Sequence, residues 1–110
     1  MDSNPQWKTA LDKGNRSRKW RAERKRELVA GTISPEEWAG LIRNPPEEMA
    51  TMKLKTALTA VPKIGRKKSD RWCKSLGLRA EAPLNKLTDR QRRLAELQLL
   101  DWRARQGQRW

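Results

Sequence analysis

Val61-Pro62-Lys63-Ile64-Gly65-Arg66-Lys67-Lys68-Ser69, residues 61–69, is the stretch that decides the fold. Before it, Leu54, Leu58 and Val61 have the spacing of the buried stripe of a helix. Pro62 cannot continue that helix, because its ring blocks the turn and it has no N–H group. The pattern therefore predicts a helix that ends here and a hairpin that leads into another helix.

The second half of this stretch predicts a seat for an anion. We expect Gly65 to supply a backbone that tolerates positive φ and close approach, and a helix to open directly after it. The first N–H groups of that helix have no partner within it, and they lie beside Arg66, Lys67 and Lys68. An ordinary turn beside a solvated basic face is the alternative, and the composition favours phosphate.

The charge balance indicates a polyanionic partner. The chain has 26 Lys and Arg against 13 Asp and Glu, a formal net charge of +13. Nucleic acid, an acidic membrane and an acidic protein all fit, but no apolar run approaches the ~18 residues that a membrane span needs. The N-terminus lacks the apolar core of a secretion signal, so we expect a cytoplasmic protein that does not enter a membrane.

The residue types that carry most catalysis are scarce. Cys73 is the only cysteine and histidine is absent, so we expect no disulfide, no metal site, no cofactor and no catalytic residues. Glu36, Glu37, Glu47 and Glu48 are interpreted as helix-start residues that face the positive end of a helix dipole, not as paired catalytic carboxylates. The protein is therefore not expected to be an enzyme.

Start and stop signals predict an all-α chain. The first helix spans residues 5–30 and stops at Gly31, and a Ser34-Pro35 cap opens the second, which runs to Asn44. The remaining predicted elements are a third helix over about residues 46–61, a fourth over 66–76 that ends at Gly77, a connector over 78–87, a last helix capped by Thr88-Asp89-Arg90-Gln91 with a buried stripe of Leu94, Leu97 and Leu100, and a fraying tail over 103–110.

The first helix carries a dense basic block. Residues 16–26 contain seven positive charges and one negative charge, which repel one another unless a polyanion lies alongside. We expect this helix to lie along the DNA backbone, with a merely solvated charged face as the alternative.

All six aromatic residues are tryptophans. Trp38 and Trp72 are expected in the core, because each has apolar neighbours at helical spacing. For Trp7, Trp20, Trp102 and Trp110, stacking on a base, contact with a partner and capping of a small core all remain open.

The order of several short motifs carries a resemblance over nearly the whole chain. These are Met52-Lys53-Leu54, Ala57-Leu58, Val61-Pro62-Lys63-Ile64-Gly65, Leu76-Gly77-Leu78, Leu87 and Asp89-Arg90-Gln91, with Ala10-Leu11-Asp12-Lys13, Arg18-Lys19, Arg21-Ala22-Glu23, Leu28 and Gly31 upstream. Together they resemble the actinobacterial integration host factor family. The resemblance implies a long basic N-terminal helix packed on a compact helix-two-turns-helix module, which is ribosomal-protein-like. It also implies non-specific duplex DNA binding, DNA bending, nucleoid organisation and help to phage integrases.

One family segment is changed. Where relatives have Arg-Arg-x-Arg-Gly-Leu-Gly before the last helix, residues 82–88 keep only Leu87 and have Lys86 as a partial substitute for the arginines. The tryptophans are not a family trait, and a divergent copy of phage or mobile-element origin fits them.

We therefore expect three parts: a basic helical arm over residues 1–31, a helix-two-turns-helix domain over 32–106 and a flexible tail over 107–110. The expected DNA-binding residues are Arg16, Arg18, Lys19, Arg21, Lys25, Pro62, Lys63, Ile64, Gly65, Arg66, Lys67, Lys68, Lys86 and Arg90. The expected protein is a monomer in the bacterial nucleoid that binds double-stranded DNA and joins an integrase or another nucleoprotein complex in recombination. RNA binding in a ribosome-like setting and binding of a protein partner through exposed tryptophans are the alternatives.

Overall fold

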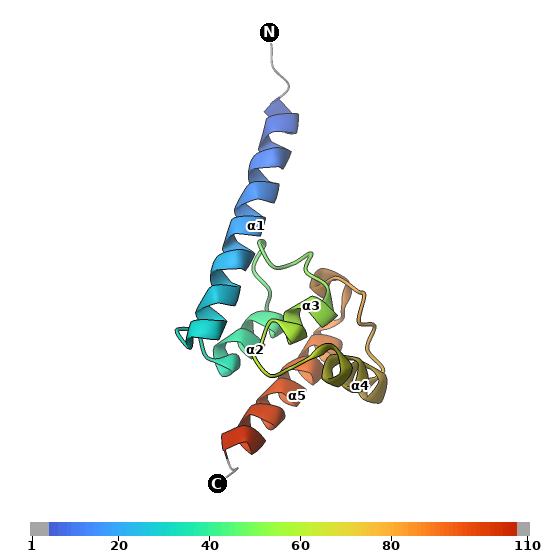
Figure 1. Cartoon of the computed structure of the whole chain (residues 1–110). Coiled ribbons are helices and arrows are strands. Elements are labelled where there is room, and N and C mark those ends of the chain that lie inside the picture. Colours follow the sequence, from blue (N-terminus) through green and yellow to red (C-terminus); the bar gives the residue numbers. More distant parts are fainter. Residues whose placement is uncertain (1–4, 108–110) are drawn as a thin grey trace.

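Helix α1 (Pro5–Ala30) extends well beyond the helices that follow it (Figure 1). The computed structural model describes the backbone of residues 5–107 and the side chains of residues 14–106. The further elements are α2 (Pro35–Arg43), α3 (Leu54–Thr59), α4 (Arg66–Leu76), a 3-10 turn η1 (Leu84–Lys86) and α5 (Asp89–Gly107). The all-α prediction is confirmed, and no helix in this part of the chain is long and apolar enough to cross a membrane.

The predicted helix ends are confirmed at four places. Gly31 and Gly77 follow α1 and α4 with φ of 82° and 68°, a backbone region that favours glycine. Ser34 caps α2 by accepting a hydrogen bond from the Glu37 amide at 3.1 Å. Thr88 caps α5 in a reciprocal pair: its hydroxyl accepts from the Gln91 amide at 3.1 Å, and its own amide donates to the Gln91 side chain at 2.9 Å.

Helix α3 is much shorter than predicted. Residues 47–51 form turns, so Glu47 and Glu48 do not start a helix, whereas Glu36 and Glu37 do lie in the first turn of α2. The reason is a tertiary pairing between residues 50–54 and the connector. In it, the Leu54 amide donates to the Ala82 carbonyl at 3.0 Å and the Leu84 amide to the Met52 carbonyl at 2.9 Å.

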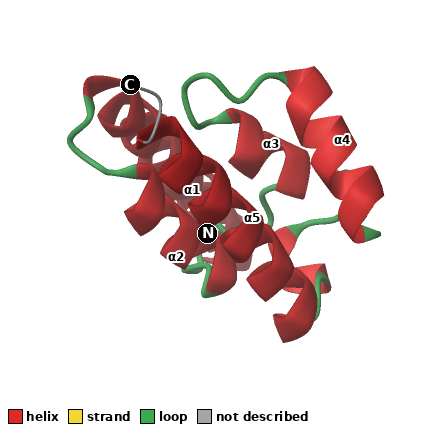
Figure 2. Cartoon of the chain, turned by 90° about the horizontal axis from the view of Figure 1, so that it is seen from below, coloured by secondary structure: helices red, strands yellow, loops and turns green. Residues whose placement is uncertain are grey.

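Helices α2 and α5 pack together as the centre of the molecule (Figure 1). Ion pairs join Glu36 to Arg103 at 3.3 Å and Arg43 to Glu96 at 3.5 Å, so the two helices run antiparallel. Helices α3 and α4 lie beside each other, as the view from below shows (Figure 2).

The buried stripe of α5 differs from the prediction. Ala95, Leu99 and Trp102 are buried, whereas Leu97 is 48% exposed and Leu94 and Leu100 lie at the edges of the core. The stripe is therefore rotated towards Trp102, because a tryptophan buries more surface than a leucine. The helix also continues to Gly107, so the prediction of a frayed tail from residue 103 was wrong as far as residue 107. Residues 108–110 lie outside the described part.

The tryptophans fill two places in the core. Trp38 is fully buried, and its indole N–H donates to the Ala57 carbonyl of α3 at 2.7 Å. Trp20 of α1 stacks on Trp38 with ring centroids 6.5 Å apart, and Trp72 meets Trp102 edge-to-face at 6.3 Å. These four side chains therefore build the core, while those of Trp7 and Trp110 are outside the described side chains.

Candidate nucleic-acid interface

The hairpin between α3 and α4 turns at Lys63. Leu54, Leu58 and Val61 are buried as predicted, and α3 ends at Thr59, before Pro62. Lys63 takes the positive φ, 74°, whereas Gly65 is extended with φ −88° and ψ 176°. The expectation that Gly65 supplies the positive φ was therefore wrong: the turn is made two residues earlier, and a Cβ on Gly65 would meet no atom within 4 Å.

Helix α4 opens without a capping side chain. Gly65 is its N-cap and offers no side chain, and the first bond within the helix runs from the Ser69 amide to the Gly65 carbonyl at 3.1 Å. The preceding amides of the first turn have no acceptor within the helix, and the helix dipole places partial positive charge there. This end of α4 is therefore a site that a phosphate fits.

The lysines and arginines around this site differ in their exposure to solvent. Lys63, Arg66 and Lys67 are exposed, whereas Lys68 is half-buried with its ammonium 5.3 Å from the centre of the Trp102 ring. Pro62 is exposed at the tip, but Ile64 is only 3% exposed. The Ile64 side chain belongs to the core, so any contact from this residue to DNA comes from its backbone.

A cleft of about 480 Å³ lies beside the hairpin. It is lined by Lys55, Thr56, Thr59, Ile64, Gly65, Arg66, Ser69 and Asp70. The cleft joins the N-terminal end of α4 to the lysine at the start of α3. Lys55 and its neighbour Lys53 were not predicted as site residues. They precede the hairpin by several residues, and only the folded structure brings Lys55 beside Gly65 and Arg66.

The outer side of α1 is a second cationic surface. Arg16, Arg18, Lys19 and Lys25 are exposed, and so is Arg26, which was not among the expected DNA-binding residues. The residues that face the body are Ser17, Trp20, Arg21, Arg24 and Leu28, with the spacing of one helical face. Helical periodicity therefore leaves most of the basic block exposed, although Arg16 and Lys19 also border the turns before α3.

Arg21 behaves differently from the rest of the basic block. Its Nε donates to the Glu48 carbonyl at 2.9 Å, and its Nη2 donates to the Thr51 hydroxyl at 2.6 Å. Arg21 therefore joins α1 to the turns before α3, and with the Trp20–Trp38 stack it fixes the base of the arm.

A larger cleft, about 550 Å³, lies at this base. It is lined by Gly14, Arg16, Ser17, Lys19, Trp20, Glu23, Glu47, Glu48 and Thr51. Three carboxylates among these residues oppose the approach of a polyanion, so the smaller cleft beside the hairpin suits phosphate better.

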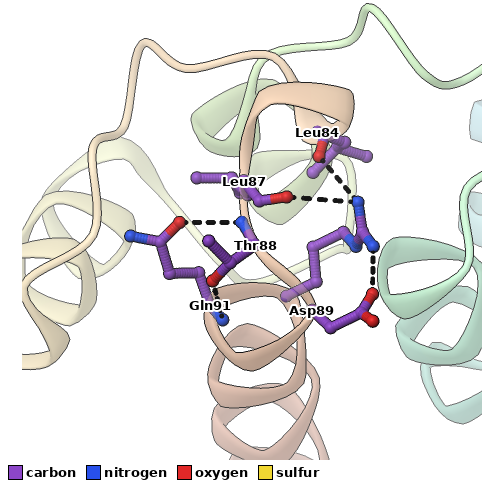
Figure 3. A network of polar contacts seen from close by, with 6 residues as sticks. Leu84, Leu87, Thr88, Asp89 and Gln91 are labelled. Carbon is purple, nitrogen blue, oxygen red and sulfur yellow. Dashed lines mark hydrogen bonds and ion pairs between the residues drawn. The ribbon is translucent and has the colours of Figure 1, made fainter.

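The segment before α5 is fixed from within the protein (Figure 3). The Arg92 guanidinium donates to the carbonyls of Leu84 and Leu87 at 3.3 and 3.2 Å and pairs with Asp89. Lys86 and Arg90 are exposed beside this network. They are the cations that this segment leaves available to an external anion.

Cys73 does not offer a nucleophile. Burial, and secondly the charge of Asp70, raise the pKa of its thiol above the ordinary value of 9.0, and the neighbouring Ser69 hydroxyl offsets only part of this rise. The thiol therefore stays protonated at neutral pH, and the thiolate is the reactive form.

A solved structure has a similar fold. It is described as the structure of sIHF bound to an 8-base-pair palindromic DNA, and it superposes with a TM-score of 0.61 at 22% sequence identity, covering 79% of this chain and 94% of that one. No protein-family model and no curated protein matches the chain. The likeness establishes the fold, which agrees with the resemblance noted from the sequence motifs.

Proposed function

We propose that this protein binds duplex DNA through the phosphate backbone with little sequence preference. The observation that carries the proposal is the uncapped N-terminal end of α4, where Gly65 leaves the first amides open beside exposed Arg66 and Lys67. A phosphate placed there accepts hydrogen bonds from N–H groups and lies at the positive end of the helix dipole. The solved structure with a similar fold contains DNA, which supports the same partner.

This arrangement favours non-specific binding. Phosphate contacts position a protein on DNA but carry no direct sequence information. The candidate cations lie on the hairpin, on α1 and on the segment that leads into α5, and their ammonium and guanidinium groups suit phosphate oxygens. We therefore expect an architectural role, with binding that is similar on unrelated sequences.

The salt dependence of binding tests this proposal. If about six phosphates are neutralised, the log–log slope of affinity against salt concentration is expected to be about −5, because each contact releases counterions. Fluorescence anisotropy of a labelled duplex over a salt series measures the slope, and a slope near zero would contradict phosphate recognition.

Structured RNA is the matched competitor in the same assay. Preferential displacement of the duplex by RNA would replace DNA with RNA in the proposal. Partner binding through exposed tryptophans has less support, because Trp20, Trp38, Trp72 and Trp102 are buried or half-buried in the core.

Bending of the duplex is a further part of the proposal. The hairpin and the outer side of α1 are separate cationic surfaces, and we propose that a duplex bends to contact both, at the cost of its elastic stiffness. We expect energy transfer between dyes at the two ends of a duplex of about 30 base pairs to rise on saturation with protein, a length suited to measurable bends. Unchanged transfer at saturation would exclude bending. The proposal extends to a role beside an integrase, which rests on bending, and to a place in the bacterial nucleoid, which rests on duplex binding alone.

A further inference from the structure

Beside the proposed phosphate site, two lysines share one carboxylate. The ammonium of Lys53 lies 3.0 Å from one Glu81 oxygen, and the ammonium of Lys55 pairs with the other. The Glu81 side chain is 64% exposed, so the group lies at the surface where a duplex can reach it. Each ammonium has three N–H donors, and Glu81 uses one of them from each lysine.

The backbone fixes Glu81 opposite these lysines. The residues on either side of it accept hydrogen bonds from the start of α3: the Lys55 amide donates to the Ala80 carbonyl and the Leu54 amide to the Ala82 carbonyl, both at 3.0 Å. These bonds hold the backbone of Glu81 in register with the two lysines. Its carboxylate therefore binds the two ammonium groups at the position where an external oxyanion would otherwise bind them.

The lysine pair is continuous with the hairpin site. Lys55 lines the cleft beside the hairpin together with Gly65 and Arg66. Through Lys55, the lysine pair therefore borders the same cleft as the start of α4, whereas Lys53 and Glu81 lie outside its lining. Carboxylate and phosphate oxygens are alternative acceptors for the same ammonium groups.

We propose that Lys53 and Lys55 form a second phosphate-binding site beside the hairpin, and that Glu81 competes with the DNA phosphate for it. The inference rests on the proposed DNA binding. Glu81 thereby lowers the affinity for duplex DNA, which keeps a non-specific binder exchangeable along the strand.

This competition does not vary with pH in the neutral range. Hydrogen bonds from Lys55 first and from Lys53 second hold the pKa of Glu81 below its ordinary value of 4.5, so the carboxylate is ionised. The experiment can therefore be made at a single neutral pH.

Glu81→Gln tests the competition, because it removes the charge and keeps the size of the side chain. We expect about fivefold tighter binding to a labelled duplex at low salt, the upper range for the loss of one exposed ion pair, and a salt slope steeper by about one to two. Glu81→Asp keeps the charge and should stay closer to the wild-type protein. Circular dichroism of each variant verifies the helical fold.

Glu36→Gln is the matched control. Glu36 is similarly exposed, at 54%, and pairs with Arg103 at 3.3 Å, but it belongs to α2 and its partner is neither Lys53 nor Lys55. Its affinity should stay within about twofold of the wild type, as for an exposed charge away from the contact. Equal gains for Glu81→Gln and Glu36→Gln would show a general charge effect and overturn the inference.

A variant that lacks both lysines tests whether the effect of Glu81 acts through them. In Lys53→Gln/Lys55→Gln protein, adding Glu81→Gln should give no gain in affinity, because the site it would release is gone. A gain that persists there would overturn the lysine site while leaving the proposed function intact. Absence of duplex binding by both the wild type and Glu81→Gln would overturn the proposed function and, with it, this inference.

Discussion

Gly65→Asp combined with Lys67→Glu is expected to weaken duplex DNA binding by about 100-fold at low salt. An aspartate at the N-cap accepts hydrogen bonds from the first amides of α4, so the protein's own carboxylate takes the place of the phosphate. Lys67→Glu replaces an exposed cation with an anion beside it. Two charge-assisted interactions account for this loss if each contributes about 1.5 kcal/mol, the lower end of the usual range, as expected for exposed groups.

The loss should be the same on unrelated duplexes, since phosphates carry no sequence information. Anisotropy titrations with two duplexes of different sequence measure it. Loss on one sequence alone would point to base recognition and away from phosphate contacts.

Gly65→Ala distinguishes an effect on folding from an effect on the contact with DNA. Gly65 has an ordinary extended backbone, and a Cβ there meets no atom of the protein within 4 Å. The substitution should leave thermal unfolding nearly unchanged. Any fall in DNA affinity then measures how closely the ligand approaches this backbone, and full wild-type affinity would place the phosphate farther from Gly65.

Trp38→Ala is expected to lower the free energy of unfolding by about 3 to 5 kcal/mol, the usual range for a buried aromatic side chain. Trp38 is fully buried. Its ring stacks on Trp20 of α1, and its indole N–H donates to the Ala57 carbonyl of α3. Its loss leaves a cavity between three helices and an unpaired carbonyl. The total free energy of unfolding of a small domain is only about 5 to 15 kcal/mol, so this substitution should remove a large part of the stability.

Urea unfolding followed by circular dichroism measures this change. Trp38→Phe is the graded control, because it keeps an aromatic ring but removes the indole N–H that bonds Ala57. We expect it to fall between the wild type and Trp38→Ala. A loss below about 1 kcal/mol for Trp38→Ala would contradict its place at the centre of the core.

Trp38 also links the two cationic surfaces. The arm rests on it through Trp20, and α3, which leads into the hairpin, rests on it through the Ala57 carbonyl. One buried side chain therefore helps to set the position of the arm relative to the hairpin. In the proposed function, this position decides whether one duplex can contact both surfaces.

Local signals in the sequence predicted most helix ends. Gly31, Ser34, Gly77 and Thr88 act within a few residues of their own position, through positive φ or a side-chain cap. The uncapped start of α4 at Gly65 was predicted in the same way, and with it the site for an anion.

Prediction failed where distant segments meet. After the prolines, no local signal in residues 46–53 argues against a helix. Pairing with residues 82–85 prevents that helix, and the same pairing brings Glu81 beside Lys53 and Lys55. The positive φ at Lys63 follows from fitting α4 against α3, which a glycine two residues later does not reveal.

The sequence by itself determined most helix ends, the basic arm and the uncapped start of α4 at Gly65, because caps, prolines and charge act locally. Only the tertiary structure decided which cations remain free. It turned Arg21 to the Glu48 carbonyl, placed Lys68 over Trp102 and brought Lys55 to the hairpin cleft, because these contacts join residues far apart in the chain.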